Sequence, residues 1–262
     1  MIRHILVRAR LAAAIWAAAV FGFPVAVTAA PAEIAVIIDD LGYRYAEGQR
    51  AIALPGAVTL AILPHTRFGA GLARAAHASG KEVIVHLPLQ PADASADPGP
   101  GALWLDMDRE QFHAALFASL AAVPHAAGVN GHMGSLLTRH PGHMAWLMSA
   151  LRRHGGLFFV DSYTTPSSVA LQLAEEFDIA AGRRDVFLDS DPDPEAIRLQ
   201  LRRLRALSLQ RGFAIAIAHP YPATLEILET ALPVLAADGI RLVPASGILR
   251  HAKIAAAPRD GG

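Results

Sequence analysis

The alternation of apolar strands with helical segments constrains the fold of this 262-residue chain more than any other feature. Its short runs of valine, isoleucine, leucine and alanine are continuous and carry few polar residues, which is typical of strands buried on both faces of a sheet. Stretches with helical periodicity separate these runs. The predicted strands span residues 33–39, 57–64, 81–88, 126–134, 156–162, 185–191, 213–220 and 240–246.

Repeated strand–helix units of this kind predict an α/β fold with a parallel sheet covered by helices. A regular β/α barrel takes about 250 residues, and the repeats here fill only residues 33–250. We therefore expect a distorted (β/α) barrel of about seven to eight parallel strands. A doubly wound open sheet is the alternative. No change of composition marks a second domain, and residues 251–262 are predicted to be a disordered tail.

The first 29 residues form a separate unit of the sequence. Three arginines without any acidic residue precede an apolar run over residues 11–27, and small residues follow up to Ala29. This layout predicts a secretory signal peptide. The alternative is an uncleaved anchor, because the apolar run is close to the shortest length that crosses a bilayer. Either reading predicts a periplasmic or secreted protein.

The charge balance and the absence of cysteine exclude several classes of function. The chain has 23 Lys and Arg against 23 Asp and Glu, so it lacks the excess positive charge of a nucleic-acid-binding protein. Without cysteine, neither disulfides nor thiolate metal sites are available. Residues 198–211 form a helical stretch with five arginines. It is interpreted as a solvated helix face or, alternatively, as a site of peripheral membrane association. The N-terminal segment could also associate with a membrane.

Histidines and acidic residues follow the predicted strands at their carboxyl ends. In parallel β/α folds these ends form one rim, which carries the active site. Histidine nitrogens and carboxylate oxygens together are typical ligands of zinc and other divalent ions. The side chains at the strand ends are Asp39, Asp40, His65, His86, Asn130, His132, Asp161, Asp189, Asp191 and His219.

The adjacent acids Asp39 and Asp40 end the first predicted strand. Like charges on neighbouring residues repel each other, and a bound divalent cation would offset that repulsion. One carboxylate would then bind the metal while the other acts as a base. The alternative is a helix cap beside a solvated acid. A single residue such as His65 is more often structural, so the prediction of a site depends on the whole set.

Five segments of the chain resemble the divergent polysaccharide deacetylase family, a branch of the NodB-like carbohydrate esterases. The segments are IIDDLGY, HLPLQP, GHMGS, FFVDS and IAIAHP, in this order, and the resemblance covers residues 33–250. It implies a distorted (β/α) barrel. It also implies an exported, metal-dependent hydrolase that removes acetyl groups from a glycan. A non-catalytic glycan- or partner-binding module that keeps the barrel and the metal is the alternative.

The resemblance also implies roles for single residues. Asp39 corresponds to the general base and Asp40 to a metal ligand. His86 corresponds to a second ligand, and His219 to the general acid. Asp161 corresponds to an acid near the base and the substrate.

The chain departs from the family pattern at two points. Gln90 stands where the ordinary enzymes have another ligand histidine, so His132 is predicted as the third ligand. The arginine–proline motif after the fourth strand is absent. The metal is expected to be Zn²⁺.

Three further residues are predicted to bind the substrate. Ser135 and Ser162 would form hydrogen bonds with sugar hydroxyls, and Trp104 would stack on a sugar ring, with a place in the core as its alternative. Ser135 is not expected to be a nucleophile, because the Gly-x-Ser-x-Gly turn of serine hydrolases is missing. No phosphate-binding glycine loop follows a strand.

Overall fold

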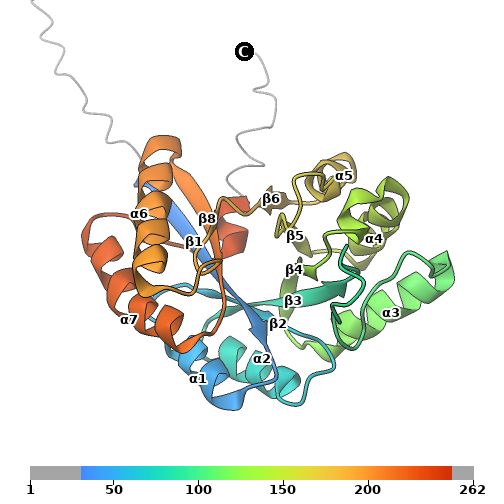
Figure 1. Cartoon of the computed structure of the whole chain (residues 1–262), viewed down its shortest axis with the longest axis horizontal. Coiled ribbons are helices and arrows are strands. Elements are labelled where there is room, and N and C mark those ends of the chain that lie inside the picture. The colour runs from blue at the N-terminus through green and yellow to red at the C-terminus, as the bar shows by residue number, and fades with distance from the viewer. Residues whose placement is uncertain (1–30, 250–262) are drawn as a thin grey trace, which may run out of the picture. The chain divides into compact units, whose positions relative to one another are not determined.

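The computed structural model describes residues 31–249. The predicted signal peptide and the predicted tail therefore lie outside the described residues. Within residues 31–249, no helix has the length and apolar character needed to cross a membrane. The predicted α/β class is confirmed, because a parallel sheet forms the centre of this part of the chain and helices cover its outer face (Figure 1).

The observed elements follow the predicted order. The strands are β1 (Glu33–Leu41), β2 (Thr59–Ile62), β3 (Glu82–Leu89), β4 (Ala126–Met133), β5 (Phe158–Asp161), β6 (Ala181–Arg183), β7 (Val186–Phe187), β8 (Phe213–Ala218) and β9 (Arg241–Leu242). The helices are α1 (Tyr45–Ala53), α2 (Gly69–Ala78), α3 (Arg109–Ala122), the 3₁₀ helix η1 (Leu137–Arg139), α4 (Pro141–His154), α5 (Ala170–Glu176), α6 (Pro194–Arg211) and α7 (Pro222–Ala237).

The strands pair in the order β6-β5-β4-β3-β2-β1-β8-β7, and β9 pairs with the first residues of β1. Every pair is parallel. Among the described strands, the two edges β6 and β7 do not pair with each other. The sheet therefore curls into an open barrel, which confirms the predicted distorted barrel (Figure 1).

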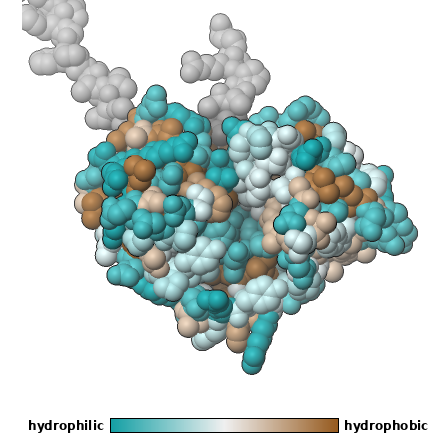
Figure 2. Space-filling view, viewed as in Figure 1, coloured by the Kyte–Doolittle hydropathy of each residue, from teal (hydrophilic) through white to brown (hydrophobic). Residues whose placement is uncertain are grey.

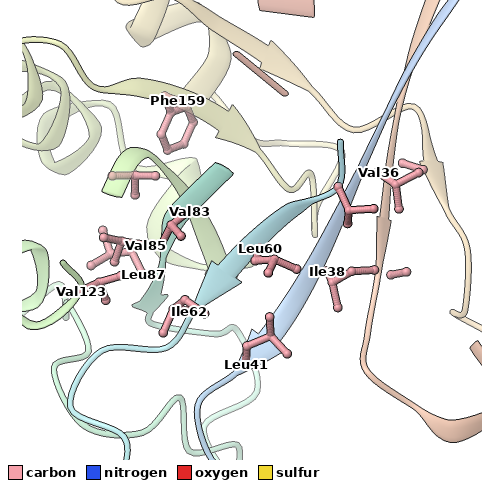
Figure 3. Packing of buried hydrophobic residues seen from close by; sticks show 14 of the residues in the cluster. Val36, Ile38, Leu41, Leu60, Ile62, Val83, Val85, Leu87, Val123 and Phe159 are labelled. Atoms are coloured by element: carbon pink, nitrogen blue, oxygen red, sulfur yellow. The ribbon is translucent and has the colours of Figure 1, made fainter. Parts of the chain in front are cut away.

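The two faces of the sheet bury separate apolar clusters, because successive side chains of a strand point to opposite faces. Val36 and Ile38 on β1 belong to the large cluster between the sheet and the helices, which Figure 3 shows. Ala35 and Ile37 belong to a smaller cluster on the concave face. The same alternation directs the side chain of the next odd-numbered residue, Asp39, into the barrel at its rim.

Two predicted strands are much shorter than expected, and one observed strand was not predicted. Of residues 240–246, only Arg241 and Leu242 form a strand. Of residues 185–191, only Val186 and Phe187 form a strand. The unpredicted strand β6 has three residues and, among the strands that the structure describes, pairs only with β5. A three-residue strand with the sequence AGR has neither a detectable period nor β-branched residues, so its existence depends on pairing with its neighbour.

Candidate metal and catalytic site

A local irregularity at the end of β1 directs both adjacent acids to the rim. The pairing with β2 shifts register between Ile38 and Leu41, and Asp40 has a φ of 56°. A non-glycine residue in this left-handed region is uncommon and tends to occur at functional sites. As a result, both carboxylates reach one histidine. The Nε2 atom of His86 lies 3.7 Å from Asp39 Oδ2 and 3.1 Å from Asp40 Oδ1.

The side chains of Asp40, His86 and His132 converge at one point. Oδ1 of Asp40 lies 2.8 Å from Nδ1 of His132 and 3.1 Å from Nε2 of His86, and the two nitrogens are 3.1 Å apart. A tetrahedral ion with bonds of about 2.0–2.1 Å separates its ligand atoms by about 3.3–3.4 Å. The structure thus brings the three predicted ligands together at nearly the spacing that such an ion requires.

The hydrogen bonding at this point is typical of metal ligands. Although both histidine nitrogens lie within 3.1 Å, the buried Oδ1 atom of Asp40 receives no well-directed hydrogen bond from the described residues. Two histidine nitrogens and one carboxylate oxygen therefore direct lone pairs to a common point. This donor set fits a divalent cation.

Asn130 links the metal ligands to the predicted base. Its Oδ1 atom lies 2.8 Å from Nδ1 of His86, and its Nδ2 atom donates to Asp39 Oδ1 over 2.8 Å. All three side chains are buried. Because the amide oxygen accepts from Nδ1, Nε2 of His86 keeps its lone pair for the metal point. The sequence placed Asn130 at a strand end but did not indicate this bridging position.

The environments of the two acids move their pKa values apart. Burial raises the pKa of Asp39, although the charges of His86 and His219 and the hydrogen bond from Asn130 oppose this shift. Burial also acts to raise the pKa of Asp40, but the close approach of His132 and His86 outweighs it and holds this pKa well below the usual range. Asp39 is therefore the more basic of the two carboxylates, as a general base requires.

Charge from the acids also stabilises protonated His86. Burial acts to lower the pKa of His86, but the charges of Asp39 and Asp40 outweigh it and raise the pKa to about 9. A cation bound at this point would replace that proton.

Asp189 orients His219 on the other side of the site. Nδ1 of His219 lies 3.0 Å from Asp189 Oδ1, and the backbone N–H of His219 donates to Oδ2 over 2.7 Å. The Thr224 hydroxyl donates to the same Oδ2. Nε2 of His219 therefore faces the metal point, 3.7 Å from Asp40 Oδ2. Burial acts to lower the pKa of His219, but Asp189 and the other nearby acids outweigh it and raise the pKa.

Asp161 is the last residue of β5. Its Oδ1 accepts from the backbone N–H of Tyr163 over 2.9 Å, and its Oδ2 accepts from the Ser168 hydroxyl over 2.8 Å. Burial raises its pKa. Among the described residues, no hydrogen bond joins Asp161 to Asp39, so the predicted closeness of Asp161 to the base is not a direct contact.

Arg184 is a charged residue near the site that sequence reasoning missed. It follows β6, and its guanidinium donates to the backbone oxygens of Ser162 and Tyr163 over 2.8 and 3.1 Å. Burial lowers its pKa, while the charges of Asp39 and Asp161 oppose that shift. The only sequence signal was an arginine pair directly before a predicted strand, which is too common to indicate a site.

Gln90 has a structural role here. Its side-chain oxygen accepts from the backbone N–H of Leu105 over 2.8 Å, and its backbone oxygen accepts from Leu136 and Leu137. These bonds fasten the segment after β3 to the segment after β4. The ligand histidine expected from the resemblance is thus replaced by a residue that holds two loops together.

The three predicted substrate-binding residues have different surroundings. The Ser135 hydroxyl accepts from the backbone N–H of Ala92 over 2.9 Å. The buried Ser162 hydroxyl has no partner among the described residues. Trp104 is half-buried and borders a shallow depression with Asp106. The Ser162 hydroxyl can therefore both donate and accept a further hydrogen bond, and the Ser135 hydroxyl can still donate one. His65 lies apart from the metal point, with Nε2 3.5 Å from the Ser119 hydroxyl.

The arginine-rich helix α6 is largely paired with acids. Arg198, Arg205 and Arg211 form ion pairs with Glu195, Asp238 and Asp185. Small hydrophobic areas interrupt the hydrophilic surface over α6 and α7 (Figure 2). The pairing favours a solvated face, and membrane association stays a prediction.

A comparison with protein families shows which family the chain belongs to. The model of the divergent polysaccharide deacetylase family matches residues 36–249. The chain belongs to this family. It is also 35% identical over 223 residues to the uncharacterized protein YibQ of Escherichia coli K12, covering 85% of this chain and 69% of that protein.

Solved structures show the same fold. An uncharacterized protein of Agrobacterium tumefaciens C58 matches with a TM-score of 0.80 at 23% identity, over 84% of this chain and 90% of that one. The peptidoglycan deacetylase PdaC of Bacillus subtilis matches with a TM-score of 0.53 at 14% identity, over 86% and 93%. A CE4 family pseudoenzyme of Bacillus anthracis matches with a TM-score of 0.51 at 12% identity, over 84% of this chain and 66% of that one. The barrel is therefore of the NodB-like deacetylase type.

Proposed function

We propose that this protein is an exported, metal-dependent hydrolase that removes acetyl groups from a glycan. The observation that carries the proposal is the convergence of Asp40, His86 and His132 beside the buried carboxylate of Asp39. His219 completes the set from the other side. Membership of the polysaccharide deacetylase family and a fold shared with a peptidoglycan deacetylase support a glycan as the substrate.

Asp40, His86 and His132 would hold the metal, and their mixed nitrogen and oxygen donors favour Zn²⁺. When bound, such an ion supplies Lewis acidity, which polarises the acyl carbonyl and makes a water molecule more acidic.

Asp39 takes the proton of the attacking water. Its Oδ1 atom is held by Asn130, and Oδ2 lies on the side of His86 and the metal point. Burial makes this carboxylate more basic than an exposed aspartate. The charges of His86 and His219 and the hydrogen bond from Asn130 favour the ionised form of Asp39, which is the form that accepts a proton.

His219 donates a proton to the leaving amine or alkoxide from Nε2. Asp189 holds the opposite nitrogen, so the ring keeps one orientation and stays protonated to a higher pH than an isolated histidine. A correctly placed general acid contributes roughly 10²–10⁴ in rate.

The second candidate function is a non-catalytic glycan-binding module that keeps the metal. Two observations favour it: the replacement of a ligand histidine by the structural Gln90, and the presence of a pseudoenzyme among proteins of this fold.

Metal analysis combined with an acetate assay separates the two functions. The purified protein would be analysed for bound metal and then incubated with acetylated chito-oligosaccharides or peptidoglycan fragments. Acetate release that is lost in Asp39→Asn supports the hydrolase. One bound metal ion per chain without acetate release from any of these glycans supports the binding module. Fractionation of cells that express the full chain tests the proposed export.

A further inference from the structure

A groove opens directly beside the metal point. It has a volume of about 240 Å³, and its lining consists of Asp40, Leu41, Tyr43, Arg44, Pro220 and Tyr221. These residues come from the end of β1, which carries Asp40, and from the segments that follow β1 and β8, the second of which begins with His219. The groove therefore begins at a metal ligand and leads away from it.

Two tyrosine rings in this groove are unusually accessible. Tyr43 is 54% exposed and Tyr221 is 46% exposed, whereas tyrosine side chains are on average intermediate in burial. The ring of Tyr221 stacks on His219 at a centroid distance of 5.4 Å and an interplanar angle of 25°. The Tyr43 hydroxyl approaches Gly99 so closely that a Cβ atom there would lie 3.2 Å from it. The ring of Tyr221 thus packs on a residue of the site, the Tyr43 hydroxyl lies close to Gly99, and both side chains stay accessible.

Arg44 adds hydrogen-bond donors to the same groove. Its side chain is 74% exposed, and its one hydrogen bond among the described residues reaches Glu47 over 3.5 Å. Most of its N–H groups are therefore available to a ligand. The groove combines accessible aromatic rings with a planar donor, which is the combination that recognises a sugar ring through its C–H face and its hydroxyl groups.

We propose that this groove binds the sugar unit next to the acetylated one, with Tyr43 and Tyr221 stacking on the sugar and Arg44 donating to its oxygens. The proposal rests on the proposed function. Sites that enclose a drug-sized ligand measure about 300–1,000 Å³. The smaller volume here fits one sugar unit, with the rest of the glycan in solvent.

Calorimetric titration with tetra-N-acetylchitotetraose, the tetramer of N-acetylglucosamine, tests the groove. The metal-loaded full chain would carry Asp39→Asn so that the ligand stays intact. Removal of one stacking ring by Tyr43→Ala or Tyr221→Ala should weaken binding roughly three- to tenfold. Tyr43→Phe should retain most of the affinity because it keeps the ring.

Tyr45→Ala is the matched control. Tyr45 is 55% exposed but lies on α1, where its ring packs 5.6 Å from Phe68 and does not line the groove. Its removal should change the affinity by less than about twofold. Because Tyr221 packs on His219, the Tyr221 variants would also be compared with the parent protein for metal content and melting temperature.

Three results would contradict the proposed sugar site. They are no binding of tetra-N-acetylchitotetraose, wild-type affinity in both alanine variants, or an equal loss of affinity in Tyr45→Ala. If binding depends on Tyr43 and Tyr221 but the unmodified chain releases no acetate, the sugar site is supported and the proposed hydrolase activity is contradicted. The two proposals therefore fail separately.

Discussion

The inner face of the barrel changes from apolar to polar within one step along three strands. Ile37, Ile84 and Ile217 form part of the apolar layer. Two residues further along are Asp39 on β1, His86 on β3 and His219 directly after β8, which belong to the site. The same alternation of inward-facing side chains thus forms a packed apolar layer inside the barrel and a group of ionisable side chains at its rim.

This difference separates stability from chemistry. The apolar layer excludes water and fixes the strand ends. Burying a charge is unfavourable unless it is paired, and the rim meets this condition through the bonds of Asn130 to Asp39 and of Asp189 to His219. Changes in the apolar layer should therefore alter the free energy of unfolding, whereas changes at the rim should alter metal binding and turnover.

The largest effect is expected from His86→Ala. The loss of one of three ligands should remove the metal and reduce acetate release below detection, as measured by elemental analysis and a turnover assay. His65→Ala is the matched control because His65 follows the neighbouring strand but lies against Ser119, away from the metal point. Full metal content in His86→Ala would contradict the assigned ligand set.

Asp39→Asn should lower turnover by roughly 10²–10⁴ while the metal stays bound. The amide keeps the acceptor for Asn130 but loses the basic oxygen. Turnover and metal content would be measured on the same preparation. Wild-type turnover in this variant would remove Asp39 from the role of base.

In the apolar layer, Ile37→Ala should lower the free energy of unfolding by about 2–5 kcal/mol, because Ile37 is fully buried. Turnover per folded molecule should not change. Urea unfolding measures the effect, and Leu209→Ala, at a position 53% exposed, should change the stability by less than about 0.5 kcal/mol. A variant with intact stability and lost turnover would break the proposed division of roles.

Asp189→Asn should shift the pH dependence of turnover. The pKa of His219 is raised, so its acidic form persists to higher pH and activity falls as the pH rises through that pKa. Without the Asp189 charge the pKa should fall, and the alkaline limb should move to lower pH. Asp191→Asn is the control. It changes an exposed acid of the same loop and should leave the alkaline limb of the pH profile unchanged. An unchanged limb in Asp189→Asn would argue against His219 as the acid.

Much of the fold and part of the site were predictable from local patterns. Continuous apolar runs indicated the strands, and the polar residues that end them indicated the rim. The contacts of Asn130 and Asp189 were not predictable, because they depend on which strands become neighbours. Arg184 was missed because it follows β6, a strand that the sequence did not reveal.

The amino-acid sequence by itself determined the alternation of strands and helices, and hence the rim on which Asp40, His86 and His132 lie. Hydrophobic periodicity and composition are local properties of the sequence, and they suffice to predict these elements and the residues that end the strands. Only the tertiary structure decided that the lone pairs of these three residues meet and that Tyr43 and Tyr221 line one groove. Those outcomes depend on sheet curvature and on the left-handed conformation of Asp40, which residues far apart in the chain impose together.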